Sequence, residues 1–155
     1  MVRDHADALL GFLTYRTGDR DLSEDLVSDT FERAIRARHR FDPRKASERT
    51  WLTTIALNVL RDHLRRRGAE GRALDTLAHG GAGEDFASGV VARTDLMAAL
   101  AVLPAEEREA LALVYGADLT AKQAARVLEV PATTVQGRVY RGLRRLRDDL
   151  DDDAT

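Results

Sequence analysis

Residues 119–147 read LTAKQAARVLEVPATTVQGRVYRGLRRLR, and this stretch decides the fold. Thr120 and Gln123 have the spacing of a capping box, which predicts the start of a helix. A short turn at residues 129–131 precedes a second segment, in which apolar residues recur at helical spacing as far as Leu146. Two helices joined by so short a turn form a helix-turn-helix, whose second helix can lie in the major groove of DNA.

The second helix of this motif is strongly basic. Residues 132–147 hold five arginines and no acidic residue, and an aspartate-rich run follows at residues 148–153. Residues 33–67 form another basic block with eleven basic and three acidic residues, whereas residues 1–32 hold eight acidic and three basic ones. The overall net charge of −2 therefore hides two basic surfaces. Many such blocks are only solvated surface, but two of them on predicted helices favour contact with phosphates.

Helical spacing of apolar residues continues through most of the chain, so the sequence predicts an all-α protein of two small helical domains. In the first domain, residues 1–67, the second helix is expected to begin at Asp21 or Ser23 and to bury a stripe that includes Ile35. Residues 68–93 contain six of the eleven glycines, which indicates a flexible linker. The second domain, residues 94–150, contains the helix-turn-helix, and residues 151–155 form an acidic tail.

The composition excludes several classes of protein. The chain has no cysteine, which excludes disulfides, thiolate metal sites and cysteine nucleophiles. No apolar run approaches the length of a membrane span and the first residues lack a signal-peptide pattern, so we expect a cytoplasmic protein without membrane insertion. The four histidines lack metal-ligand spacing and no glycine-rich phosphate loop is present. We therefore expect no enzyme activity, no catalytic residues, no metal and no cofactor.

Two stretches resemble a known family. Residues 103–150, with their LPAEER opening, helix-turn-helix and TVQGRVYRGLRRLR pattern, resemble region 4 of the extracytoplasmic-function (ECF) sigma factors of the sigma-70 family. Residues 23–67, with DLVSDTFERA, FDP and WLTTIALN, resemble region 2. The resemblance implies a sigma factor that directs promoter-specific transcription initiation by recognising the minus-35 duplex and melting the minus-10 DNA. The implied partners are core RNA polymerase (the β′ coiled coil and the β subunit), promoter DNA and an anti-sigma factor.

The resemblance also assigns residues to three surfaces. The residues expected to bind the polymerase are Asp25, Leu26, Ser28, Asp29, Phe31 and Arg33. The residues expected to hold the opened minus-10 strand are Arg44, Lys45, Arg49, Trp51, Thr54, Asn58, Arg61 and Arg65. The residues expected to contact the minus-35 duplex are Thr133, Thr134, Gln136, Arg138 and Arg141.

Several of these assignments have alternatives. Leu26 and Phe31 are also typical of a helical core, and a lone tryptophan such as Trp51 is more often a core anchor than a surface on which DNA stacks. Glu129 stands where the family commonly has a turn glycine, so that turn must find another geometry or carry strain. A stand-alone helix-turn-helix regulator remains the alternative function. It would need an apolar ligand pocket where residues 43–67 are instead crowded with arginine.

Overall fold

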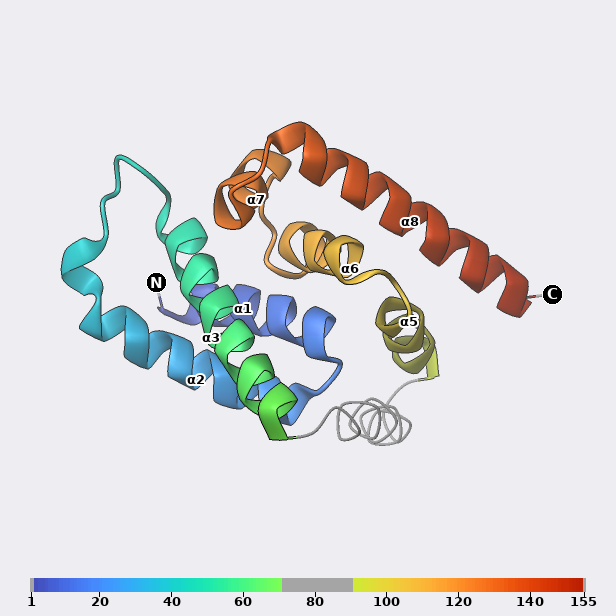
Figure 1. The fold of residues 1–155 in the computed structure, drawn as a ribbon, viewed down its shortest axis with the longest axis horizontal. Coiled ribbons are helices and arrows are strands. Elements are labelled where there is room, and N and C mark those ends of the chain that lie inside the picture. Colours follow the sequence, from blue (N-terminus) through green and yellow to red (C-terminus); the bar gives the residue numbers. More distant parts are fainter. Residues whose placement is uncertain (1, 71–90, 155) are drawn as a thin grey trace.

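The computed structural model describes residues 2–70 and 91–154, and every regular element in these ranges is helical. The first half contains α1 (Val2–Thr17), α2 (Arg20–Arg36), the short 3-10 turn η1 (Arg38–Arg40) and α3 (Glu48–Glu70). The second half contains α5 (Val91–Ala101), α6 (Ala105–Leu111), the π-helical turn η2 (Ala112–Gly116), α7 (Ala121–Leu128) and α8 (Ala132–Ala154). Figure 1 shows the helices of each half grouped together. The predicted all-α fold is confirmed.

Helices extend into the segments that the sequence analysis left outside the two domains. α3 continues to Glu70 and α5 begins at Val91, both within the predicted linker. The rest of that linker, residues 71–90, lies outside the described residues. α8 continues to Ala154, through most of the predicted acidic tail. Within the two described ranges, no helix combines the length and the hydropathy that crossing a bilayer requires.

α2 begins earlier than predicted. The carboxylate of Asp19 accepts a hydrogen bond from the backbone N–H of Leu22 at 3.1 Å, so Asp19 is the N-cap and the predicted start at Asp21 or Ser23 is wrong. Such a cap contributes about 1 kcal/mol, because it satisfies an N–H without a partner inside the helix. The reason for the earlier start is Gly18, whose φ of 72° ends α1 directly before Asp19.

The first half is held together by apolar faces of its three α-helices. Leu9, Phe12 and Leu13 of α1 are at most 1% exposed and belong to the same cluster as residues of α2 and α3. The buried positions of α2 follow a single face: Ser23, Leu26, Thr30 and Ala34. Ile35 lies about 100° around the helix from Ala34 and is 72% exposed, so its predicted burial is wrong. The buried face of α2 is narrower than the run of apolar residues in the sequence.

The predicted helix-turn-helix is confirmed in the second half. Thr120 and Gln123 form a complete capping box at the start of α7, with the two reciprocal hydrogen bonds at 3.0 and 3.1 Å. Glu129 ends α7 in the left-handed conformation, with φ 57° and ψ 45°. The turn therefore forms without a glycine because Glu129 itself adopts the left-handed conformation, which costs about 1–2 kcal/mol of conformational free energy. α8 then packs back on the motif through Val135, which is fully buried.

The two halves share one hydrophobic core. Leu113 of η2 and Leu119 before α7 belong to the same buried cluster as Phe12 and Leu57 of the first half. α1 lies against η2, and α3 lies against α7. A smaller cluster joins α5, α6 and α8: Ala99, Leu100, Leu103, Leu111 and Leu146. The chain therefore forms one packed body, an arrangement that the sequence analysis did not predict.

Candidate nucleic-acid interface

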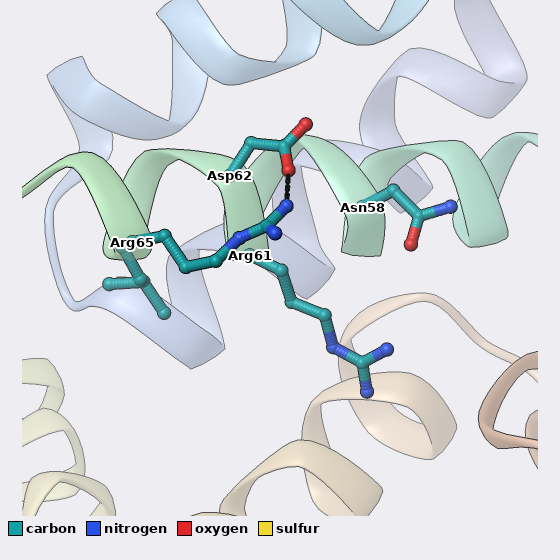
Figure 2. A pocket seen from close by; sticks show the side chains of 5 residues that line it. Asn58, Arg61, Asp62 and Arg65 are labelled. Carbon is teal, nitrogen blue, oxygen red and sulfur yellow. Dashed lines mark hydrogen bonds and ion pairs between the residues drawn. The ribbon is translucent and has the colours of Figure 1, made fainter.

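One side of α3 carries most of the residues predicted to hold the minus-10 strand. Their spacing of three or four places them along a single face: Trp51, Thr54, Asn58, Arg61 and Arg65. The last three line an open hollow of about 680 Å³ together with Asp62 and Leu64 (Figure 2). The side chains of Arg61 and Arg65 are 51% and 78% exposed. This end of α3 therefore presents two guanidinium groups and one amide on an open surface.

Trp51 anchors the loop that precedes α3. Its ring centroid lies 5.0 Å from that of Phe41, with the ring planes tilted by 42°, a geometry that stabilises aromatic pairs. Trp51 also packs against the hydrophobic core and is half-buried. Thr54, one turn further along, donates its hydroxyl to the carbonyl of Thr50 at 2.9 Å. The structure therefore supports the alternative that Trp51 anchors the core, although part of its indole ring remains at the surface.

The loop of residues 41–47 presents two more predicted cations. The side chain of Arg44 is 92% exposed, and its backbone N–H donates to the carboxylate of Asp42 at 2.9 Å. Lys45 is also exposed. Arg49 lies two positions before Trp51, and residues two apart do not share a helix face. Arg49 therefore lies on a different face of α3 from Trp51 and the other predicted minus-10 residues of that helix.

Asp62 is a site residue that the sequence analysis missed. Its carboxylate accepts a hydrogen bond from Arg33 of α2 at 2.8 Å, and its other oxygen pairs with Arg65 (Figure 2). The hydrogen bond from Arg33, with a further one from Arg65, holds the pKa of Asp62 below its usual 3.8. Asp62 therefore stays anionic and orients two predicted site residues. Its only signal in the sequence is that it is the single acid among residues 49–67.

The exposed face of α2 differs from the predicted polymerase-binding set at two positions. Asp25, Ser28 and Asp29 are exposed, whereas Leu26 is 2% exposed and belongs to the core. Phe31 and Arg33 are half-buried. Ile35 lies seven residues after Ser28, so it shares the exposed face and adds an apolar side chain that the sequence analysis had assigned to the interior.

α8 presents a second exposed face. Thr133, Gln136 and Tyr140 follow one another at helical spacing, and all three are exposed. Tyr140 is 66% exposed and was missed by the sequence analysis, although its position one turn after Gln136 pointed to it. Arg141 is exposed beside this face, and Thr134 is half-buried.

Arg138 lies on a different side of α8. Its side chain is only 18% exposed, and its Nη2 lies 3.7 Å from the carboxylate of Glu106 in α6. Arg145 likewise donates to Glu107 of α6 at 2.9 Å. Arginines of the predicted DNA-reading helix thus divide into those that face α6 and those that face away from it.

Arg61 contacts the second half of the chain. Its Nη2 lies 3.7 Å from the carboxylate of Glu109 in α6, and Arg16 of α1 lies 3.8 Å from the same residue. Figure 2 shows the guanidinium of Arg61 directed away from Asp62. The side chains of Glu109 and Arg16 are each 15% exposed, so this acid lies between two cations of the first half in a largely buried position.

Family models match both halves. Residues 1–70 match the model of sigma-70 region 2, and residues 93–146 match that of sigma-70 region 4. The chain is 34% identical to the ECF RNA polymerase sigma factor SigC of Mycobacterium tuberculosis, over 92% of this chain and 77% of that protein. It is 29% identical to the ECF RNA polymerase sigma factor BldN of Streptomyces coelicolor, over 97% of this chain but 59% of that protein. The chain thus spans about three fifths of the length of that relative.

The fold is also similar to a solved structure. The sigma factor RpoE from Bartonella quintana, in its complex with the anti-sigma factor NepR, superimposes with a TM-score of 0.76 and 26% identity. The match covers 95% of this chain and 92% of that one, so the two halves have a similar relative placement in both proteins.

Proposed function

We propose that this chain, which belongs to the ECF sigma factors of the sigma-70 family, directs RNA polymerase to promoters. In this function α2 binds the core enzyme, α3 and the loop before it hold the opened minus-10 strand, and α8 reads the minus-35 duplex. Family membership favours this function over a stand-alone helix-turn-helix regulator. The chain acts in the cytoplasm together with the polymerase and contributes no catalytic group of its own.

The observation that carries the proposal is the exposed face of α3. A single strand is held by cations that contact its phosphates and by groups that accept stacked or extruded bases. The hollow beside Asn58 is large enough for a base, with Arg65 at its edge. The amide of Asn58 can both donate to and accept from a base edge. Arg44 and Lys45 extend the cationic surface along the loop.

α8 suits the reading of a duplex. Gln136 can form paired hydrogen bonds with adenine, and Arg141 can contact guanine or a phosphate. Tyr140 adds an exposed aromatic ring between them, so we include it in the minus-35 surface. We give Arg138 a positioning role, because its guanidinium faces Glu106 in α6.

α2 suits contact with a protein. An exposed apolar residue surrounded by polar and charged ones is the usual make-up of an interface, and Ile35 provides it two helical turns after Ser28 on the same face of α2. We propose that this face binds the β′ coiled coil, and that the β subunit contacts the second half. The similarity to RpoE in its complex with NepR supports an anti-sigma factor as a further partner.

Run-off transcription with purified core polymerase tests this function. The chain should direct specific initiation from a subset of a promoter library, and Asn58→Ala should reduce open-complex formation while a pull-down of core polymerase is unchanged. Arg20→Ala is the control, because Arg20 is an exposed cation that lies outside α3 and pairs with Glu24 of its own helix, α2. No specific initiation across the library, with core polymerase still bound, would contradict the proposal.

A further inference from the structure

A second hollow lies between α2 and α3, next to the one that contains Asn58. Its volume is about 470 Å³, and its lining consists of Arg33 of α2 and Asp62, Arg65 and Arg66 of α3. We call it the arginine hollow. It shares Asp62 and Arg65 with the first hollow, whereas Arg66 has no part in the function proposed above.

The arginine hollow is positively charged. Three of its four lining side chains are guanidinium groups, which remain protonated at neutral pH, and the fourth is a single carboxylate. The positive potential extends to His63, whose pKa is lowered by burial and then by the charges of Arg67 and Arg66. The hollow therefore attracts anions.

Asp62 holds two of the three guanidinium groups in place. One of its carboxylate oxygens accepts a hydrogen bond from Nη1 of Arg33 at 2.8 Å, and the other pairs with Nη2 of Arg65. A guanidinium group has five N–H donors, so each of these arginines keeps donors for a ligand. The side chains of Arg33 and Arg65 are 43% and 78% exposed, so a ligand can reach them from solvent. Groups that are oriented before a ligand arrives lose less entropy when it binds.

The arginine hollow lies to one side of the face that we expect to hold DNA. That face follows Trp51, Asn58 and Arg65 along α3 at helical spacing. Arg66 lies about 100° around the helix from Arg65, and the guanidinium of Arg61 points away from Asp62 (Figure 2). A strand that runs along this face can therefore contact Arg65 without entering the arginine hollow.

The lining residues indicate the chemistry of the ligand. The planar fork of arginine forms paired, charge-assisted hydrogen bonds with phosphate oxygens. Three forks from two helices offer more donors than a single phosphate group uses, and they fit two linked phosphate groups. Because Arg65 and Arg66 are exposed, the rest of a larger ligand can project into solvent.

We infer that the arginine hollow binds a small anion with two or more linked phosphate groups, such as pyrophosphate or the polyphosphate end of a nucleotide. Arg33, Arg65 and Arg66 would hold this ligand. The phosphodiesters of nucleic acid share the same chemistry, so the experiment has to separate the two sources. The inference goes beyond the proposed function and does not depend on it.

Calorimetric titration of the full-length chain with sodium pyrophosphate, in a buffer of low salt without divalent metal, tests the site. We expect one site per chain and a Kd that rises about tenfold in Arg66→Ala, because a charge-assisted pair of hydrogen bonds is lost. Arg66→Lys should recover part of the affinity, because lysine keeps the charge but lacks the fork. Sulfate should bind at least about tenfold more weakly than pyrophosphate, because it engages fewer of the forks.

Arg36→Ala is the matched control. Arg36 is an exposed arginine of α2 that pairs with Glu32 and does not line the hollow, so its loss changes the net charge equally and should leave the Kd for pyrophosphate within about twofold. Equal weakening by Arg36→Ala and Arg66→Ala, or equal binding of sulfate and pyrophosphate, would show an adventitious ion only and overturn the inference.

Single-stranded DNA separates the two sources of phosphate. With a fluorescent 20-nucleotide strand, Arg66→Ala should leave the slope of log K against log salt unchanged. A slope reduced by about 0.7 in Arg66→Ala, without measurable binding of pyrophosphate, would make the hollow part of the DNA surface and refute the inference. Failure of the proposed function would differ, because run-off transcription would give no specific product while pyrophosphate binding still responded to Arg66→Ala.

Discussion

Replacing Phe12 with alanine should destabilise both halves of the molecule together. The side chain of Phe12 is fully buried in a cluster that contains residues of α1, α2, α3, η2, α7 and α8. Removing a buried phenyl ring costs about 3–5 kcal/mol, which includes the cavity left behind. In a chain of this length each kcal/mol lowers Tm by about 2–4 °C, so we expect a fall of about 10 °C. That loss is a large part of a typical total stability of about 5–15 kcal/mol.

Calorimetry and hydrogen exchange measure this effect. The parent chain should unfold in a single transition, and Phe12→Ala should lower that transition without splitting it. Amide protection in α1 and in α7 should fall by similar free energies, because both lose the same core. Leu64→Ala is the control: Leu64 is 39% exposed and should cost no more than about 1 kcal/mol. Two transitions, of which Phe12→Ala shifts only one, would refute a shared core.

Three further predictions concern the surfaces and the pH dependence. Tyr140→Ala should lower the minus-35-dependent rate of open-complex formation about threefold to tenfold, whereas Val102→Ala, at another exposed apolar position, should not. Arg65→Ala should reduce by about 0.7 the slope of log K against log salt for single-stranded DNA; an unchanged slope would exclude a phosphate contact. Burial, together with the nearby charges of Arg67 and Arg66, lowers the pKa of His63 below 6.5. As the pH falls from about 7 to about 5, His63 is therefore protonated more readily in the unfolded chain than in the folded one, so the free energy of unfolding decreases. Urea titrations of His63→Gln should show a smaller loss over that range.

The sequence was informative wherever a feature depends on neighbouring residues. The capping box at Thr120, the turn at Glu129 and the apolar spacing of α8 involve residues within about one helical turn of each other, and these predictions are confirmed. The start of α2 shows the limit of this reasoning. Asp19 and Asp21 are equally good capping residues, and the left-handed Gly18 decides between them.

What the sequence did not reveal depends on residues far apart in the chain. Asp62 and Arg33 are 29 positions apart, and the pairing of Arg61 with Glu109 joins the two halves. Composition identifies a basic helix but not the direction of each guanidinium. Arg138 and Arg141 are equivalent in the sequence, yet the first faces α6 and the second is exposed. Separating them requires the packing of α8 on α6.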